Sequence, residues 1–336
     1  MDPVTHMTLG AAVALSLSNH ANRRASAGAG VIAGLLPDAD VFIRSSADPL
    51  LAIEYHRGFT HGWVFQPVTA LVAIGLSLLL GRLFRHRGSA RPMFLAILAA
   101  ALSHPFCDLW TSYGTRVNWP FSEARPALDL VSVIDPLLTL PLLIAAVVGW
   151  KRRSRGWALA GLVWVSLYLG LGAVQRLRAL AAVQQHLAET GQRADRLAVR
   201  PSFGNIVVWR AVWQQGDRLH CAMVRLTGEV QWTEGESADL VQIDRDASLA
   251  ATAPEGSVLR RDLARFAHFS DDWLVRFADQ PDVIGDARYS MDPRALKPLW
   301  GIRMRGTDEH VAFETFRSDS RKRLSELLDL ILVGKR

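Results

Sequence analysis

Histidine and aspartate side chains occur in the first half of the chain at spacings that suit metal binding. His104 and Asp108 are four residues apart, so on a helix they share one face and can bind the same ion. Asp38 and Asp40 flank a single residue, a spacing that suits an extended turn offering two carboxylates to one or two metals. Each pair alone also fits a packed histidine or an ordinary turn, so only the whole set indicates a metal site.

Further imidazoles accompany these pairs. His56 and His61 bracket a glycine-containing turn from which two imidazoles can converge, and His6 lies close to residue 1. Mixed imidazole and carboxylate ligation suits Zn²⁺, Mn²⁺ or Fe²⁺ better than Ca²⁺ or Mg²⁺. The predicted metal ligands are His6, Asp38, Asp40, His56, His61, His104 and Asp108. They exceed what one tetrahedral zinc ion needs, so the set allows one ion or two, with zinc favoured over manganese and iron.

A divalent ion held by these residues would support hydrolysis, because it lowers the pKa of a bound water to about 7. We expect Asp40 or Asp135 to accept the proton from that water. Arg57 lies between the two loop histidines and is a candidate for pairing with a phosphoryl oxygen or stabilising negative charge. Two plainer interpretations stay open. Asp135 before a proline equally fits a helix N-cap, and Arg57 equally fits an arginine that meets lipid headgroups.

The composition indicates that membrane helices position this set. The chain has 336 residues, of which 50% are hydrophobic, and its mean hydropathy is +0.13. Residues 1–175 carry 14 Lys and Arg and 9 Asp and Glu, whereas residues 176–336 carry 24 and 23. This division excludes a disordered chain and a purely soluble enzyme. The two cysteines are far apart and exclude a cysteine-based zinc site. The net charge of +6 does not indicate a nucleic-acid partner, because most of the excess lies in short clusters between apolar runs.

Six windows of the first half contain no charged side chain, and we interpret them as membrane segments. They are residues 3–22, 25–37, 58–81, 92–107, 136–150 and 156–175. A helix needs about 20 apolar residues to cross a bilayer, which the third and sixth windows supply outright. The first two are rich in Ala and Gly and predict a tight helical hairpin packed within a bundle.

The basic residues predict how these segments are oriented. They cluster between alternate windows, at Arg23 and Arg24, at Arg82, Arg85, Arg87 and Arg91, and at Lys151, Arg152, Arg153 and Arg155. If every window spans once, all three clusters lie on one side, which should be cytoplasmic. Both termini and residues 176–336 are then expected outside, in the periplasm of a Gram-negative cell. The predicted metal ligands, placed without reference to this rule, all fall at the outer ends.

The second half predicts a small α+β domain outside the membrane, over residues 176–336. The expected elements are an amphipathic helix over 176–198, strands Val207–Trp213 and His220–Leu226, a turn into Val230–Trp232, a helix over 256–278, a strand pair Trp300–Arg305 and His310–Phe316, and a closing helix Ser320–Val333. The expected fold is therefore a multi-pass helical bundle over residues 1–175 followed by this domain. Nothing in the domain has a catalytic signature.

The motifs of residues 1–175 resemble those of the YdjM-like family of membrane-bound metal-dependent hydrolases. The matching segments are His6-Met-Thr-Leu-Gly10, the Leu-Leu-Pro-Asp-Ala-Asp run ending at Asp40, His56-Arg-Gly-Phe-Thr-His61, His104-Pro-Phe-Cys-Asp108, Trp110-Thr-Ser-Tyr-Gly-Thr115, Trp119-Pro-Phe121 and Asp129-Leu-Val-Ser-Val-Ile-Asp135-Pro. Gly62 departs from the family, which usually has Ser there. The resemblance implies a metal-dependent hydrolase embedded in the inner membrane. It does not indicate the substrate.

A site at the outer membrane face favours a lipid-linked or membrane-proximal substrate, and we expect a phosphoester, although the same groups suit amide hydrolysis. Membrane lipids are therefore the expected partners. Two other classes compete with the enzyme. A metal or proton transporter predicts polar residues along the whole depth of the bundle, but the inner halves of the segments are nearly bare. A sensor or scaffold with a structural metal needs no open coordination position.

Overall fold

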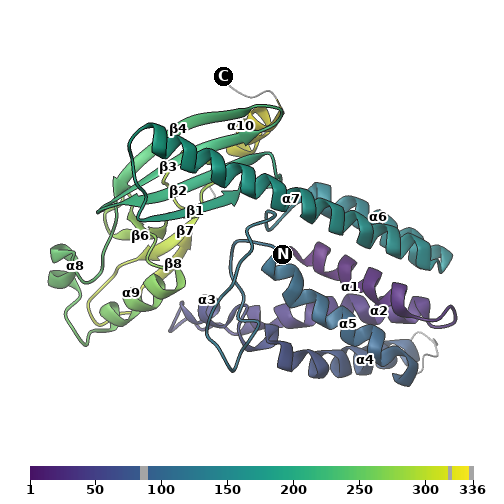
Figure 1. Cartoon of the computed structure of the whole chain (residues 1–336). Helices are drawn as coiled ribbons and strands as arrows, with labels where there is room; N and C mark the ends of the chain where they lie inside the picture. The colour runs from purple at the N-terminus through teal and green to yellow at the C-terminus, as the bar shows by residue number, and fades with distance from the viewer. Residues whose placement is uncertain (84–89, 317–319, 333–336) are drawn as a thin grey trace. The chain divides into compact units, whose positions relative to one another are not determined.

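The computed structural model describes residues 1–83, 90–316 and 320–332 (Figure 1). Two compact units share the chain and exchange short segments. The first unit contains Met1–Phe42, Tyr55–Val174 and Phe203–Asn205. The second contains Ile43–Glu54, Gln175–Ser202 and Ile206–Arg336. Neither unit is therefore a single continuous stretch of sequence.

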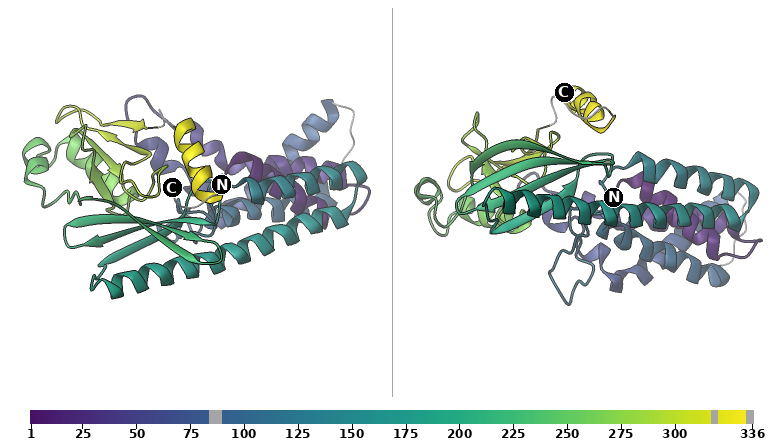
Figure 2. Two further views of the ribbon diagram at one scale, coloured as in Figure 1. Left: turned by 90° about the horizontal axis from the view of Figure 1, so that it is seen from above. Right: turned by 45° about the horizontal axis from the view of Figure 1, so that its top comes forward.

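The first unit is built from long helices that lie side by side (Figures 1 and 2). They are α1 (Pro3–Leu17), α2 (Arg23–Leu35), α4 (Gln66–Leu83), α5 (Ala90–Leu109), α6 (Pro136–Arg152) and the first part of α7 (Arg155–Glu189). Each of the six predicted windows overlaps one of these helices, which confirms the helical character of this half. Arg85 and Arg87 of the second basic cluster lie outside the described residues.

Three stretches of the described residues are long and apolar enough to cross a membrane. They are Arg23–Phe42, Trp63–Gly81 and Arg155–Glu189, while Pro3–Leu17 and Met93–Leu109 are shorter apolar helices. Large apolar side chains point outward along these helices, among them Leu71, Leu95 and Leu167. An exposed apolar surface of this kind fits contact with lipid. The prediction of six spans stays a prediction.

Helices α1 and α2 approach each other closely, as the small residues of the first two windows predict. A Cβ atom at Gly10 would collide with the Gly30 carbonyl, and one at Gly34 would collide with the His6 carbonyl. The absence of side chains at these positions lets the two backbones touch. The contact fixes the start of α1, which carries His6, against the end of α2.

Short elements connect α2 to α4. The 3₁₀ helix η1 (Leu36–Phe42) continues directly from α2, and a five-residue helix, α3 (Leu51–Tyr55), follows it. Two further 3₁₀ turns, η2 (Phe59–His61) and η3 (Trp63–Phe65), lead into α4. Turns of this kind change the direction of successive side chains over short distances. Four of the seven predicted ligands lie on or between these short elements.

The second unit contains two four-stranded antiparallel sheets with consecutive strand order. The first sheet comprises β1 (Arg196–Pro201), β2 (Val208–Gln215), β3 (Arg218–Leu226) and β4 (Val230–Asp239), and the second comprises β5 (Leu274–Arg276), β6 (Val283–Asp286), β7 (Trp300–Arg303) and β8 (Ala312–Thr315). Helices α8 (Ala247–Thr252) and α9 (Val258–Phe269) separate the sheets in sequence, and α10 (Ser320–Leu332) follows β8. This confirms an α+β domain.

Two details of the prediction for this unit are wrong. The expected helix over 176–198 ends at Glu189, because Gly191 has a φ of +67° that ends it, and β1 begins at Arg196. The expected helix over 256–278 ends at Phe269, where Asp271 and Asp272 adopt positive φ angles and the chain enters β5. Val333, the last residue of the predicted closing helix, lies outside the described residues.

Candidate metal centre

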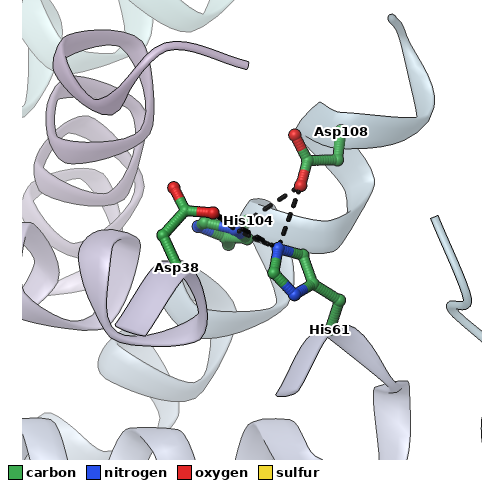
Figure 3. Close-up of side chains that lie close together, drawn as sticks. All are labelled: Asp38, His61, His104 and Asp108. Atoms are coloured by element: carbon green, nitrogen blue, oxygen red, sulfur yellow. Dashed lines mark hydrogen bonds and ion pairs between the residues drawn. The ribbon is translucent and has the colours of Figure 1, made fainter. Parts of the chain in front are cut away.

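Four of the predicted ligands converge on one point in the first unit (Figure 3). They are Asp38, His61, His104 and Asp108, and one ligand atom from each lies within 4.8 Å of the others. The Nε2 atoms of His61 and His104 are 3.0 Å apart. Asp108 Oδ2 lies 3.2 Å from the first and 3.5 Å from the second, and Asp38 Oδ1 lies 3.5 Å from both.

These separations match the edges of a tetrahedral coordination shell. Zinc bonds to nitrogen and oxygen of about 2.0–2.2 Å place neighbouring ligand atoms roughly 3.4 Å apart. Five of the six separations among these four residues run from 3.0 to 3.5 Å, and the sixth, between Asp38 and Asp108, is within 4.8 Å. His61, His104 and Asp108 are buried, whereas Asp38 is half-buried and marks the side that faces outward.

The other ring nitrogen of each histidine is already engaged. His104 Nδ1 lies 2.6 Å from the Gly34 carbonyl, so it donates a proton there. His61 Nδ1 lies 3.0 Å from Thr60 Oγ1, which itself donates to Asp40, and 3.3 Å from Asp40 Oδ2. In the neutral tautomers that these partners select, both Nε2 atoms carry lone pairs. In these tautomers the two Nε2 atoms, 3.0 Å apart, can bind the same cation.

Asp40 is a buried acceptor that connects the loop histidines. Its carboxylate accepts from His56 Nδ1 at 2.9 Å, from the Arg57 backbone N–H at 3.0 Å and from Thr60 Oγ1 at 2.8 Å. Asp38, Asp40 and His56 also form a second group whose ligand atoms lie within 4.8 Å of one another. Asp38 therefore belongs to two adjacent groups of metal-type ligands.

His6 lies beside the four-residue cluster without belonging to either group. Its ring stacks on that of His104 with centroids 3.7 Å apart, and its Nε2 is 3.2 Å from Asp108 Oδ1. The side chain is buried, and neither ring nitrogen has a geometrically acceptable hydrogen bond among the described residues. The Met1 amino group forms an ion pair with the same carboxylate.

Arg57 also forms an ion pair with Asp108. Its Nη2 is 3.0 Å from Asp108 Oδ1, and its Nη1 donates to Thr111 Oγ1 at 3.0 Å. The guanidinium lies 4.8 Å from the centre of the Tyr113 ring, and the side chain is buried. A buried arginine in these contacts is not an interfacial residue meeting headgroups. It partly neutralises the cluster and fixes the orientation of Asp108.

Asp135 has a different environment. It is the N-cap of α6, where it accepts the N–H groups of Leu137 and Leu138, and both of its carboxylate oxygens lie 3.0 Å from the Tyr168 hydroxyl. Among the described residues, no hydrogen bond or ion pair joins it to the cluster. The structure thus supports the plainer of the two interpretations of this residue.

The helices bring these side chains together because neighbouring helices run in opposite directions. His6 lies in the first turn of α1, Asp38 follows the end of α2, and His61 precedes α4. His104 and Asp108 are in the last turns of α5, one above the other on the same face. All the ligand-bearing termini therefore meet at one end of the unit.

Sequence reasoning missed the side chains that support the ligands. Thr60, Thr111 and Tyr113 contact Asp40 or Arg57, although all three lie within the motifs quoted above. The structure also explains why position 62 is a glycine. A Cβ atom there would lie 2.8 Å from the Trp119 carbonyl, so a serine at this position requires a shift of the loop.

Fold and site together define an integral membrane protein with metal-type ligands clustered at one end of its helices. The chain belongs to the YdjM inner membrane protein family, which matches residues 1–179. An inner-membrane location follows from this membership and from the candidate spans.

Two curated relatives each resemble part of the chain. The protein named inner membrane protein YbcI of Escherichia coli (strain K12) is 32% identical over 124 residues, which are 36% of this chain and 69% of the relative. The protein named uncharacterized protein YfhP of Bacillus subtilis (strain 168) is 29% identical over 133 residues, or 40% of this chain. The alignment spans 38% of the length of the Bacillus protein. No solved structure is significantly similar to the chain.

Proposed function

We propose that the first unit is a membrane-embedded, metal-dependent hydrolase whose centre consists of Asp38, His61, His104 and Asp108. The observation that supports this most is the pair of imidazole Nε2 atoms 3.0 Å apart, each with its Nδ1 engaged elsewhere. Zinc is the favoured ion, and manganese or iron also suits the donor set. A bound ion of this kind lowers the pKa of a coordinated water to about 7.

A second ion is part of the proposal. The adjacent group of Asp38, Asp40 and His56 offers three more ligand atoms, and His56 is partly exposed to the outward side. His6 is a candidate for completing either shell, because its buried ring nitrogens have no hydrogen-bond partner among the described residues. Asp38 belongs to both groups and would contribute to holding either ion.

We assign the proton-accepting role to Asp40 rather than Asp135. Asp40 accepts from His56 Nδ1, so the pair can take up a proton on the outward side of the cluster. Asp135 is occupied as a helix N-cap. Arg57 holds Asp108 in place, and its positive charge beside the centre would stabilise a negatively charged substrate oxygen.

The surroundings of the cluster favour a lipid-linked or membrane-proximal substrate. Val41 and Phe42, directly after Asp40, expose 43% and 74% of their surface. Exposed apolar side chains beside polar ligands suit a substrate with an acyl chain and a polar headgroup. We favour a phosphoester because of Arg57, and an amide is the alternative bond.

Topology completes the proposal. The basic residues Arg24 and Arg153 lie at the end of the helices opposite to the metal-type ligands, and the positive-inside rule assigns that end to the cytoplasm. With six spans, the cluster and the second unit are then periplasmic.

The proposal is tested by measuring the metal content of the purified protein and screening it for hydrolysis of lipid phosphoesters. We expect one or two zinc equivalents per chain and hydrolysis that a chelator abolishes. A fully coordinated metal without turnover on any substrate would favour a sensor or scaffold with a structural metal, since four protein ligands also suit a closed site. Metal transport into vesicles would instead favour a transporter.

A further inference from the structure

The stretch that joins the two loop motifs of the centre belongs to the second unit. Residues Ile43–Glu54 connect Asp40 to His56, yet their contacts place them with the β sheets. Leu50 and Ile53 are 0% and 7% exposed, so the stretch is anchored by apolar burial. Asp48 accepts the Leu50 N–H at 3.1 Å and so shapes the turn before α3.

Arg265 on α9 binds this stretch through two carboxylates. Its Nε and Nη2 donate to the two oxygens of Glu54 at 2.6 and 2.8 Å, a bidentate pair. Its Nη1 and Nη2 lie 3.1 and 3.0 Å from the two oxygens of Asp48. These contacts join residues 211 and 217 positions apart in sequence. Hydrogen bonding to Glu54 raises the pKa of Arg265, which stays charged.

Arg265 is itself held in place. Its Nη1 also donates to Asp262 Oδ1 at 2.9 Å, and Asp262 is buried. The second oxygen of Asp262 accepts the Val311 N–H at 3.1 Å and lies 2.9 Å from His310 Nδ1. The guanidinium therefore binds three carboxylates from a rigid position on α9.

The same group of carboxylates does not suit a metal. Ligand atoms of Asp48, Asp262 and His310 lie within 4.8 Å of one another, as an ion site requires. The Arg265 guanidinium already contacts both carboxylates and supplies the positive charge. Arg265 therefore holds this stretch of the chain in place, and its guanidinium leaves no room for a cation.

We propose that Arg265 is a positioning residue of the metal centre, which fixes the path of the chain between Asp40 and His56 by anchoring Asp48 and Glu54. The inference rests on the proposed metal centre. Ligands carried by flexible loops bind an ion well only if their separation is fixed to within about 0.5 Å. Anchoring the linker at its centre and end shortens the free chain on each side and lowers the entropy cost of assembling the ligands.

The test compares Arg265→Gln with Arg303→Gln in the full chain. Arg303 is a matched control because it also lies in the second unit, pairs with Asp282 and Glu314, and has a side chain 28% exposed against 23% for Arg265. Hydrogen exchange is measured on the metal-free proteins over residues 36–62, and zinc affinity is measured by competition with a chromophoric chelator.

We expect Arg265→Gln to speed exchange over residues 36–62 and to weaken zinc affinity roughly tenfold, the low end of the effect of outer ligand supports. Arg303→Gln should change neither quantity. Arg265→Lys should give an intermediate result, because lysine keeps the charge but loses the bidentate pair. Unchanged exchange and affinity in Arg265→Gln, or equal changes in Arg303→Gln, would overturn the proposal.

Glu54→Gln keeps the test decisive if Arg265→Gln does not fold. It removes the bidentate pair but leaves Asp48 and Asp262 on the guanidinium, and it should change exchange and affinity in the same direction. A parent protein that binds none of zinc, manganese and iron would refute the proposed centre. The exchange comparison on metal-free protein would then still decide whether Arg265 orders the loops.

Discussion

The chemistry of the candidate centre depends on which nitrogen of each histidine is left free. The Gly34 carbonyl fixes the His104 ring, and Thr60 with Asp40 fixes the His61 ring. Both rings therefore present a lone pair to the same point, beside the carboxylates of Asp108 and Asp38. Under the proposed function, a cation would bind here with only small movements of the ligands.

Removing one ligand from α5 should remove the metal. We expect His104→Ala and Asp108→Ala to lose bound zinc and chelator-sensitive hydrolysis, because each leaves a buried, incomplete shell. Metal content by elemental analysis checks this. His20→Ala is the matched control, since His20 is exposed at the far end of α1 and should keep full metal content. Unchanged metal in both α5 variants would reject these residues as ligands.

Asp40 and Asp135 should behave differently when each is changed to asparagine. Asp40→Asn keeps the shape of a residue that accepts from His56, Arg57 and Thr60 but removes its charge, and we expect turnover to fall about 10²–10⁴-fold. Bound metal should fall far less than in His104→Ala. Asp135→Asn preserves an N-cap acceptor and should leave metal and turnover near the parent. Full activity in Asp40→Asn would reject it as the proton acceptor.

The sequence was sufficient to predict which residues gather at the site. It was not sufficient to predict which of them are ligands and which support the ligands. His104 and Asp108 were predictable from their spacing on one helix face. The N-cap role of Asp135 was predictable from the proline that follows it, but its bond to Tyr168 and the contact of Arg57 with Asp108 were not, because these partners lie more than 30 residues away. Fixed partners of that kind leave no periodicity in the sequence.

Helices α1 and α2 function as one element because their glycines touch. We expect Gly10→Val to lower stability by about 1–3 kcal/mol, since the added carbons meet the Gly30 carbonyl. Thermal unfolding in detergent measures the change. Gly28→Ala on α2 is the control: a Cβ there meets nothing within 4 Å, and alanine favours helix. Equal stability of Gly10→Val and the parent would show that the hairpin is looser than described.

Topology is tested at the ends of the helices. Lys151 and Arg193 are exposed and lie at the two ends of the α6–α7 region, and both native cysteines are buried. We expect Lys151→Cys to react only with reagents that reach the cytoplasm and Arg193→Cys with impermeant reagents from the periplasm. Labelling of both from the same side would contradict the six-span arrangement.

Helices were easier to predict than strands. Each uncharged window became a helix, because lipid-compatible stretches have few alternatives. In the second unit, β1, β5 and β6 were missed. β5 and β6 have only three and four residues, too few to show an alternating pattern, and they are defined by pairing with neighbouring strands.

At the scale of the whole molecule, the two units exchange chain in both directions. Ile43–Glu54 leaves the helical unit to join the sheets, and Phe203–Asn205 returns to the helices, where the Gly204 N–H donates to Ser132 at 3.0 Å. No hydropathy pattern predicts such an exchange. The sequence division at residue 175 describes the composition of the chain, whereas contacts define units that are discontinuous.

The burial of Leu50 and Ile53 has a practical consequence for anyone who shortens this protein. A chain cut after Val174 looks like a complete helical half, but it would keep Ile43–Glu54 and lose α9 and the sheets that cover it. The stretch would then expose two core side chains, and Asp48 and Glu54 would lose their arginine, within a few residues of the ligands Asp40 and His56. Such a fragment could insert correctly and still misreport the metal affinity and activity of the native protein.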